Sequence, residues 1–579
     1  MEVVNVTAHE RMANSLQWAV DQDDAVFFFT VRPAPMMMPS LLPARCGLFS
    51  TLVLVVGLLL CTGCKDTGHV SSDSHSRSSG SPMAGAPSPA VRQQADEPEF
   101  NTEDYAHIEE NSFQAVADHP LSTFSIDTDG ASYSNVRRFL RREGRLPPPD
   151  AVRIEELINY FPYDYPDPEG DTPFSVTMEM DAAPWNPAHR LLHIGLQGER
   201  LAIEDRPPTN LVFLLDVSGS MNAPDKLPLL KEAFGLLTEQ LTEDDRVSIV
   251  VYAGASGVVL PPTSGDQNNR IREALERLEA GGSTAGASGI ETAYQLAAEN
   301  VRPGGINRVI MATDGDFNVG PSSDAALIRL IEEKREDGTF LTMLGFGTNN
   351  LKDNKMEQLA NHGNGSYQYI DSVLEARKVL VDELGGTLQT IAQDVKIQVE
   401  FNPAEVAAYR LIGYENRALA AEDFADDTED AGEMGAGHSV TALYEIIPVG
   451  ADTETDVRTT GDLRYQQRDT SAAARSGEWL LTRLRYKLPG GTTSRLIEQP
   501  FRPADTRVST DFHFAAAVAE FGMLLRNSER RGSATYDHAL ALARDGLGDD
   551  TGGYRTAFLD LVRDAQRIAD GADTVAGQE

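Results

Sequence analysis

The middle of the chain alternates short apolar runs with longer segments whose apolar residues recur at helical spacing. Residues 211–215 are an uninterrupted apolar run, residues 227–241 carry leucine and phenylalanine three or four positions apart, and residues 247–252 are apolar again. Short apolar runs are typical of strands buried on both faces. Further buried strands are expected at 307–313, 340–346 and 367–370. The alternation predicts a doubly wound, mostly parallel α/β sheet over residues 208–394.

On either side of this unit the period of the apolar positions changes to two. Residues 174–180, 395–401 and 484–488 alternate apolar and polar side chains, which indicates half-buried strands. We expect strands before and after the α/β unit to form one β-sandwich into which that unit is inserted. The flanking modules then span residues 102–207, with helices and strands, and residues 395–505, which are rich in strands.

Helices are expected at both ends of the folded part, over residues 102–160 and 506–579. Phe514, Val518, Phe521 and Leu525 fall on one face of a C-terminal helix, which should pack on the sandwich or on a neighbouring helix. Asp127 and Asp129 precede one of the N-terminal helices. A helix-start cap is favoured for them over a calcium site.

The N-terminus carries an export pattern. Residues 48–60 are almost wholly apolar, too short for a membrane span of about 20 residues, and are followed by Cys61-Thr62-Gly63-Cys64. Residues 36–63 are predicted to be a signal peptide. Its end resembles a bacterial lipobox, which implies that Cys64 is lipidated and becomes the mature N-terminus. Residues 1–35 are interpreted as an N-terminal extension, which would be absent if translation began at Met36, Met37 or Met38.

Residues 64–101 are rich in Ser, Gly, Pro and Ala, which predicts a disordered tether. The three cysteines are Cys46, Cys61 and Cys64, so cleavage before Cys64 leaves no pair of thiols for a disulfide. An exported chain without spare thiols is consistent with an oxidising compartment.

The chain is strongly acidic, with 50 Lys and Arg against 88 Asp and Glu and a formal net charge of -38. Such an excess disfavours nucleic acid and anionic membrane surfaces as partners, so the lipid anchor is the expected membrane contact. Residues 422–433 concentrate seven of the acidic side chains, most of them among small residues. A solvated loop is favoured for them over a calcium site, because the spacing follows no known ligand pattern.

The run at 211–215 ends in Asp216-Val217-Ser218-Gly219-Ser220, and the strand expected at 307–313 ends before Asp314. The carboxyl edge of a parallel sheet is where such folds bind ligands. Carboxylates and hydroxyls are the hard oxygen ligands that suit Mg²⁺ or a similar divalent ion. The alternative is that Asp216 and the two serines cap the following helix.

At this point the pattern resembles the von Willebrand factor type A (VWA) domain. The resemblance implies a metal-ion-dependent adhesion site that holds Mg²⁺, Mn²⁺ or Ca²⁺. Its implied ligands are Asp216, Ser218, Ser220, Thr284 and Asp314. It also implies that the ion is completed by an Asp or Glu carboxylate of a protein partner. The segments 123–127, 153–162 and 409–417 resemble parts of bacterial VWA lipoproteins that carry additional N- and C-terminal modules.

Binding is therefore expected, and catalysis is not. No Gly-x-Ser-x-Gly, phosphate-cradling loop, calcium loop or helical zinc motif fits the junction. Two alternatives stay open: a Mg²⁺-dependent hydrolase of phosphate esters, with Asp316 as its base, and a structural envelope scaffold. The expected location is the bacterial cell envelope, and Lys65 after Cys64 favours the outer membrane where there are two.

Overall fold

The computed structural model describes residues 103–201, 206–253, 255–282, 287–315, 324–348, 351–455, 457, 459–461, 464–465, 470–503 and 508–576. They belong to one compact unit, residues 93–579. Among the described residues, no helix has both the length and the apolar character needed to cross a membrane. The signal peptide, Cys64 and the tether lie outside the described residues.

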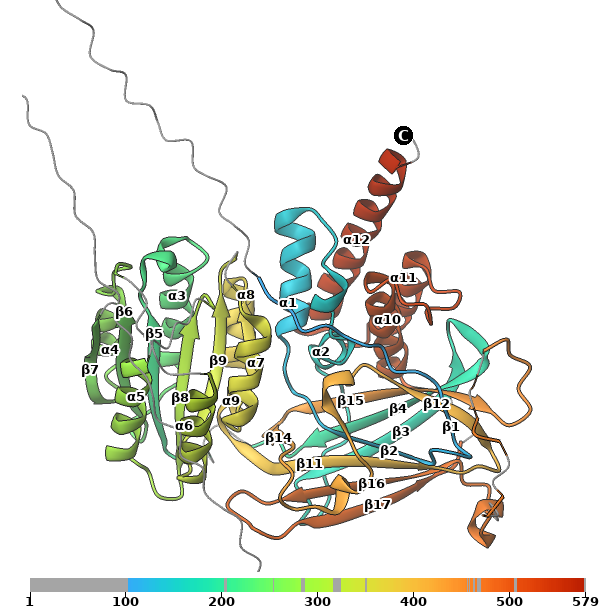
Figure 1. Cartoon of the computed structure of the whole chain (residues 1–579). Coiled ribbons are helices and arrows are strands. Elements are labelled where there is room, and N and C mark those ends of the chain that lie inside the picture. Colours follow the sequence, from blue (N-terminus) through green and yellow to red (C-terminus); the bar gives the residue numbers. More distant parts are fainter. Residues whose placement is uncertain are drawn as a thin grey trace, which may run out of the picture. The chain divides into compact units, whose positions relative to one another are not determined.

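The predicted doubly wound sheet is present (Figure 1). Its strand order is β10-β9-β8-β5-β6-β7, and every neighbouring pair is parallel except β6 with β7. The strands are β5 (Thr209–Asp216), β6 (Arg246–Ala253), β7 (Ala255–Ser264), β8 (Ile306–Thr313), β9 (Phe340–Phe346) and β10 (Tyr367–Ile370). Residues 209–388 are called the α/β domain below.

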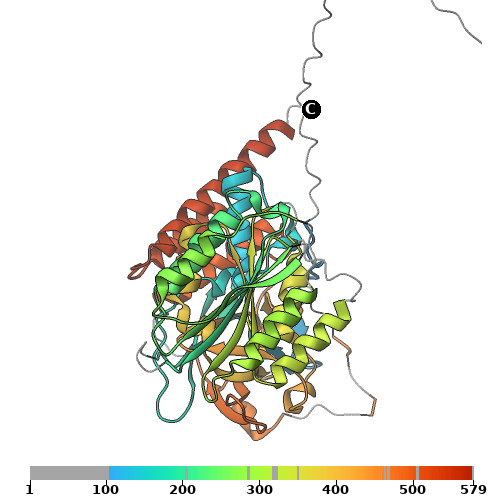
Figure 2. The same ribbon diagram turned by 90° about the vertical axis from the view of Figure 1, so that its left-hand side faces the viewer.

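Helices cover both faces of this sheet (Figure 2). Leu211, Phe213 and Leu215 of β5 pack with α3, α4, α8 and α9, whereas Val212 and Leu214 pack with α5, α6 and α7. Successive side chains of a strand point to opposite faces, so the uninterrupted apolar run is the expected consequence of burial on both sides. The helices are α3 (Leu227–Thr238), α4 (Asn268–Glu276), α5 (Ala287–Glu299), α6 (Asp324–Glu336), α7 (Asp353–His362), α8 (Val373–Arg377) and α9 (Leu384–Leu388).

Two antiparallel sheets form the predicted sandwich. One has the order β1-β12-β15-β4-β3, and the other has the order β13-β2-β11-β16-β17, with β14 also paired to β11. Apolar residues of both sheets share one core. The strands are β1 (Gln114–Ala115), β2 (Leu121–Ser125), β3 (Phe174–Ala183), β4 (Asn186–Gly198), β11 (Thr390–Phe401), β12 (Val406–Ile412), β13 (Ala418–Leu419), β14 (Gly432–Gly435), β15 (Ser439–Pro448), β16 (Leu480–Lys487) and β17 (Arg495–Phe501).

The α/β domain is inserted into this sandwich, as predicted. β4 precedes the domain and pairs with β15, which follows it; β2 precedes it and pairs with β11. Each sheet therefore needs strands from both sides of the insertion. The expectation of helices throughout residues 102–160 is wrong at Leu121–Ser125, which is a strand, because its partly apolar sequence finds a long partner in β11.

Helices from both ends of the folded part pack together on the outer face of the β4–β15 sheet. The C-terminal residues Phe514, Val518, Phe521 and Leu525 share a core with Leu191 of β4 and with residues of the N-terminal helices. The prediction that the C-terminal helices pack on the sandwich or on a neighbouring helix is confirmed, since they do both. The helices are α1 (Ala131–Arg138), α2 (Ile154–Asn159), α10 (Thr510–Leu525), α11 (Tyr536–Asp545) and α12 (Tyr554–Ala576).

Asp127 and Asp129 do not cap α1, so that prediction is wrong. The residue before α1 is Gly130, which has no side chain with which to cap the helix. Arg417 instead donates to both carboxylates, at 3.1 Å each, and Asp129 Oδ1 accepts the N–H of Tyr367 at 2.8 Å. The two aspartates thus join the N-terminal segment to the sandwich and to the α/β domain.

Glu155 of α2 is a buried carboxylate in this region, with 1% of its surface exposed. Its Oε2 accepts no hydrogen bond from the residues that the structure describes. Burial, and secondarily the carboxylate of Glu415, raises the pKa of Glu155 to about 7 from an ordinary value of 4.5. Ionised Glu155 therefore destabilises the fold at neutral pH.

We expect Glu155→Gln to stabilise the protein in a pH-dependent way. Below about pH 4.5 the wild-type side chain is neutral in both states, so the variant should gain little. As pH rises from 4.5 through 7 the unfolded state ionises first, and the gain should grow to about 1–3 kcal/mol above pH 7. Urea unfolding at pH 4.5 and pH 8 measures it, with exposed Glu109→Gln as the control. A variant less stable than wild type at pH 8 would contradict the prediction.

Candidate metal centre at the carboxyl edge of the α/β sheet

Asp216 is the last residue of β5 and is fully buried. Its Oδ1 accepts the N–H of Ser218 at 2.8 Å, and its Oδ2 accepts the hydroxyls of Thr313 at 3.1 Å and Tyr252 at 3.3 Å. These bonds fix both oxygens of the carboxylate. Burial raises the pKa of Asp216 to about 6, and nearby Asp314 acts in the same direction.

The two serines lie together on the turn after β5. Ser218 is 2% exposed, Ser220 is half-buried, and their hydroxyl oxygens are 2.9 Å apart. The short helix Gly219–Asn222 follows, and the Ser218 side chain makes no cap hydrogen bond to it. The helix-cap alternative is therefore not supported at Ser218, and its hydroxyl lies beside a second hydroxyl and two residues from a carboxylate.

Asp314 follows β8 directly and is also fully buried. β5 and β8 are parallel neighbours, with Leu215 opposite Ala312, so Asp216 and Asp314 leave the sheet side by side at its carboxyl edge. Because both carboxylates are buried, their mutual repulsion is poorly screened. A divalent ion between them would offset that repulsion.

The loop that contains Thr284 is anchored to the first loop by backbone hydrogen bonds. The N–H of Gly281 donates to the carbonyl of Val217 at 2.8 Å, and the N–H of Gly219 donates to the carbonyl of Gly282 at 3.2 Å. Thr284 itself lies outside the described residues, as does Asp316 of the hydrolase alternative. The described geometry thus brings together four of the five predicted ligands and the stem of the loop that carries the fifth.

Lys226 was not predicted to belong to this site. Its Nζ donates to Asp314 Oδ2 at 2.9 Å, and only 8% of the Lys226 side chain is exposed. The side chain lies over Gly347, where a Cβ atom would collide with it and where φ is +74°. Glycine is required at that position for both reasons. The sequence contained one signal, a lysine ten residues after Asp216, but spacing alone does not separate it from a surface lysine.

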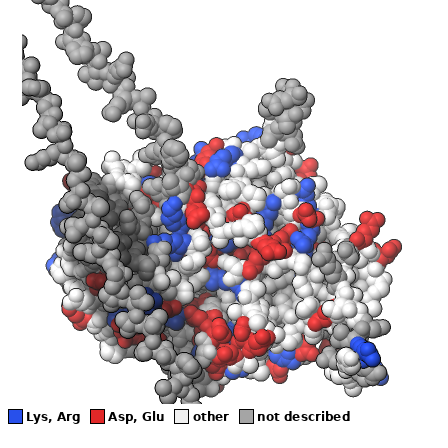
Figure 3. Space-filling model, viewed as in Figure 1, with Lys and Arg blue, Asp and Glu red and all other residues white. Residues whose placement is uncertain are grey.

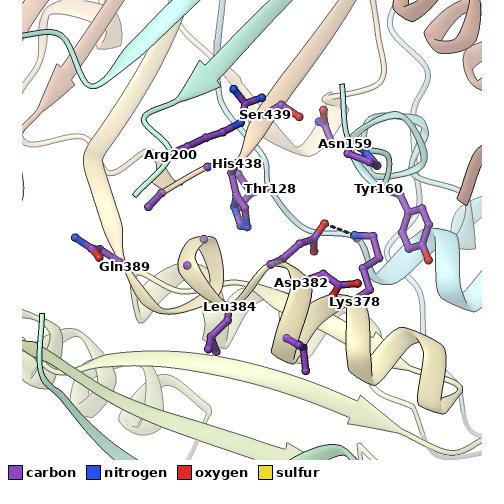
Figure 4. A pocket seen from close by; sticks show the side chains of 18 of the residues that line it. Thr128, Asn159, Tyr160, Arg200, Lys378, Asp382, Leu384, Gln389, His438 and Ser439 are labelled. Carbon is purple, nitrogen blue, oxygen red and sulfur yellow. Dashed lines mark hydrogen bonds and ion pairs between the residues drawn. The ribbon is translucent and has the colours of Figure 1, made fainter. Parts of the chain in front are cut away.

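A separate cavity of about 440 Å³ lies where the sandwich meets the α/β domain (Figure 4). Several of its polar side chains interact within the lining, since Lys378 contacts Glu383 at 2.5 Å and Tyr554 donates to Asp382 at 2.9 Å. Arg206, another lining residue, precedes β5 at the amino edge of the sheet. The cavity is therefore at the opposite end of β5 from Asp216.

Comparison with known proteins supports this architecture. The family model for the von Willebrand factor type A domain matches residues 210–382, one for von Willebrand factor matches residues 99–193, and one for the C-terminal part of Uncharacterized protein YfbK matches residues 386–568. Uncharacterized protein YfbK of Escherichia coli (strain K12) is 41% identical over 474 residues, which cover 80% of this chain and 81% of that protein.

The chain belongs to the YfbK family. The three matched segments correspond to the helical and strand module before the insertion, the VWA domain, and the modules after it. The predicted membership among bacterial VWA proteins with additional N- and C-terminal modules is confirmed.

Two other matches are more distant. Inter-alpha-trypsin inhibitor heavy chain H3 of Homo sapiens is 30% identical over 210 residues, which cover 34% of this chain and 23% of that protein. A solved structure, von Willebrand factor type A from Catenulispora acidiphila, is 18% identical and covers 68% of this chain and 91% of its own, with a TM-score of 0.36.

Replacing Lys226 should strengthen divalent-ion binding. Lys226→Gln removes a positive charge 2.9 Å from Asp314. We expect the Kd for Mg²⁺ to fall by about tenfold, roughly 1.4 kcal/mol. Calorimetric titration measures the change. Lys231→Gln is the matched control, because Lys231 lies on α3, which begins directly after Lys226, and donates to the carbonyls of Glu276 and Leu278. Weaker Mg²⁺ binding by Lys226→Gln would show that the ammonium supports the site.

Proposed function

We propose that the protein is a lipid-anchored component of the bacterial cell envelope that binds a protein partner through a divalent ion. The ion, Mg²⁺ or else Mn²⁺ or Ca²⁺, would be held by Asp216, Ser218, Ser220, Thr284 and Asp314. The observation that carries the proposal is the convergence of Asp216, both serines and Asp314 at one edge of the sheet.

The chemistry of these ligands favours recruitment of another anion. Three hydroxyls are neutral, so an ion held by them and two carboxylates retains affinity for a further anionic oxygen. A carboxylate of an Asp or Glu on the partner has the required charge and size. The net charge of -38 would repel an acidic partner at long range, so the attraction has to act within a Debye length of roughly 8 Å at physiological salt.

Acidic side chains form clusters between basic ones on the face shown in Figure 3. This distribution supports a partner whose contact surface pairs with both signs of charge and supplies one carboxylate to the ion. It gives no support to nucleic acid, whose uniform phosphate charge requires a basic surface.

Binding is proposed in place of catalysis. VWA domains are interaction modules, and no relative named above carries an enzyme name. The hydrolase alternative requires a base beside the ion, and its candidate, Asp316, is not among the described residues. No observation favours that alternative.

Capture experiments with matched variants test the ion's role. Full-length protein, immobilised in detergent, should retain one or more envelope proteins in Mg²⁺, lose them in chelator and regain them when Mg²⁺ is restored. Asp216→Asn and the Ser218→Ala/Ser220→Ala double variant should retain at most about a tenth of the wild-type amount. Asp266→Asn, an exposed carboxylate of the same domain, should behave as wild type.

Two other outcomes would reject the binding proposal. Retention that survives chelation shows that the partner does not need the ion. If chelation lowers the thermal stability but leaves retention of the partner unchanged, the ion stabilises the fold and does not bind the partner.

The lipid anchor has its own test. Cells expressing the protein and fed an alkyne-bearing fatty acid should label the wild type and Cys46→Ser, whereas Cys64→Ser should carry no label. Fractionation of the wild type should place it with the outer membrane in a bacterium that has two membranes. Label that persists in Cys64→Ser would contradict the proposed anchor.

A further inference from the structure

Away from the candidate metal centre, the geometry points to a second divalent-cation site, suited to Ca²⁺, formed by Asp394, Asp430 and Glu433. One carboxylate oxygen from each of these residues lies within 4.8 Å of the others. The site goes beyond the proposed partner-binding function, because it shares no ligand with the centre at Asp216.

Two strands and the acidic stretch of the sequence meet at this point. Asp394 lies in β11 where the pairing with β14 is irregular, between the pairs formed by Ala392 and Val395, and its φ is +52°. Glu433 belongs to β14, and Asp430 precedes that strand. The expectation that residues 422–433 form a solvated loop is wrong for Gly432 and Glu433, because they belong to β14, which pairs with β11.

Glu433 provides an observation independent of the clustering. Both of its carboxylate oxygens are buried, and neither accepts a hydrogen bond from the described residues. Removing a carboxylate from water without a compensating partner is costly, so such a group normally holds a cation or a proton. The guanidinium groups of Arg335 and Arg308 lower the pKa of Glu433, but neither donates a hydrogen bond to its carboxylate within the described part of the chain.

The neighbouring cations leave ligand atoms available. Arg335 contacts Asp430 Oδ2 at 2.5 Å, and Lys487 contacts Asp394 Oδ2 at 2.6 Å. Asp394 Oδ1 accepts the N–H of Ala431 at 3.3 Å, a long bond. Each cation thus engages one oxygen of its aspartate, and neither contacts Glu433.

Mutual repulsion within the cluster supports a bound cation. Burial raises the pKa of Glu433 well above its ordinary value, and the charges of Asp394 and Asp430 act in the same direction. Burial also raises the pKa of Asp430, and the nearby charge of Asp394 acts in the same direction. Arg335 and Lys487 each pair with one aspartate and neither contacts Glu433, so ionisation of all three carboxylates is favoured by a further positive charge between them.

The ligand chemistry selects Ca²⁺. All three groups are hard oxygen donors, and Ca²⁺ binds oxygens at roughly 2.3–2.6 Å in flexible geometry, so ligands on opposite sides can be about 5 Å apart. Mg²⁺ demands a tighter octahedron, at roughly 2.0–2.1 Å. A cavity of about 230 Å³ lies beside the cluster and is lined in part by Asp430 and Glu433.

A bound ion would connect two parts of the fold. Asp430 contacts Arg335 of α6 in the α/β domain, while Asp394 belongs to a sandwich strand. An ion shared by Asp394, Asp430 and Glu433 would therefore hold the end of the acidic stretch to β11 and, through Arg335, to the α/β domain.

Calorimetric Ca²⁺ titration and thermal melts of chelator-treated full-length protein in detergent, at pH 7.5, test the site. Wild type should bind Ca²⁺ saturably and melt at a higher temperature with it. Glu433→Gln and Asp394→Asn should lower the affinity at least tenfold and abolish the shift. Asparagine tolerates a positive φ, so Asp394→Asn should keep the backbone. Glu429→Gln, an exposed carboxylate of the same stretch, is the control.

Asp216→Asn separates this site from the candidate metal centre. In that variant the Ca²⁺ heat and the melting shift that depend on Glu433 should persist, whether or not the centre at Asp216 binds an ion. No Ca²⁺ binding by wild type would show that the cluster holds protons, and would overturn the inference. So would Ca²⁺ binding that Glu433→Gln and Asp394→Asn leave unchanged.

Discussion

The closure of the sandwich around the inserted domain is the constraint on which the rest of the fold depends. β4 and β15 come from opposite sides of the insertion and pair along most of their length. The chain that leaves β4 and the chain that enters β11 must therefore return to one place. Two backbone hydrogen bonds of 2.8 Å hold both stretches of chain against the segment that precedes β15. The N–H of Gly198 donates to the carbonyl of His438, and the N–H of Ala436 donates to the carbonyl of Gln389.

This constraint fixes one end of the α/β domain and leaves the other end for chemistry. The start of β5 and the end of α9 both lie near the closure, because the residues just before β5 and just after α9 line the same cavity. Asp216 ends β5 at the far edge of the sheet. A parallel sheet collects its ligand-binding loops at that edge, so the architecture separates the attachment of the α/β domain to the sandwich from the site proposed to bind a partner.

Lys226 gives the candidate metal centre an internal competitor. Its ammonium partly neutralises Asp314, which is buried next to another carboxylate. A divalent ion would have to overcome the repulsion of that ammonium or displace it. The affinity of the site for the ion is therefore expected to depend on two free energies: that of binding the ion to the five proposed ligands, and that of breaking the contact between Lys226 and Asp314.

Much of the architecture could be predicted because it follows from local pattern. The uninterrupted apolar run at 211–215 predicts a strand buried on both faces, and the alternation at 395–401 predicts a strand buried on one face. The structure has strands at both places. The placement of Asp216 and Asp314 side by side after β5 and β8 could be predicted because parallel strands end at a common edge.

Contacts between segments far apart in sequence could not be predicted. Lys226 reaches Asp314 across 88 positions, Arg417 reaches Asp127 across 290, and Glu433 meets Asp394 only because β14 adds to β11. The sequence near Leu121–Ser125 does not by itself distinguish a short helix from a strand, because the strand forms by pairing with β11, which is distant in sequence. Asp127 and Asp129 resemble helix caps locally, and their actual role depends on an arginine supplied by the sandwich.

The most direct test of the central claim is anomalous X-ray diffraction from crystals of the protein grown with Mn²⁺. The account predicts an anomalous peak between Asp216 and Asp314, with hydroxyl oxygens of Ser218, Ser220 and Thr284 in the shell of ligands and waters around it, and with Lys226 withdrawn from Asp314. Absence of any peak at this edge at millimolar Mn²⁺, with the Lys226 ammonium still bound to Asp314, would contradict it.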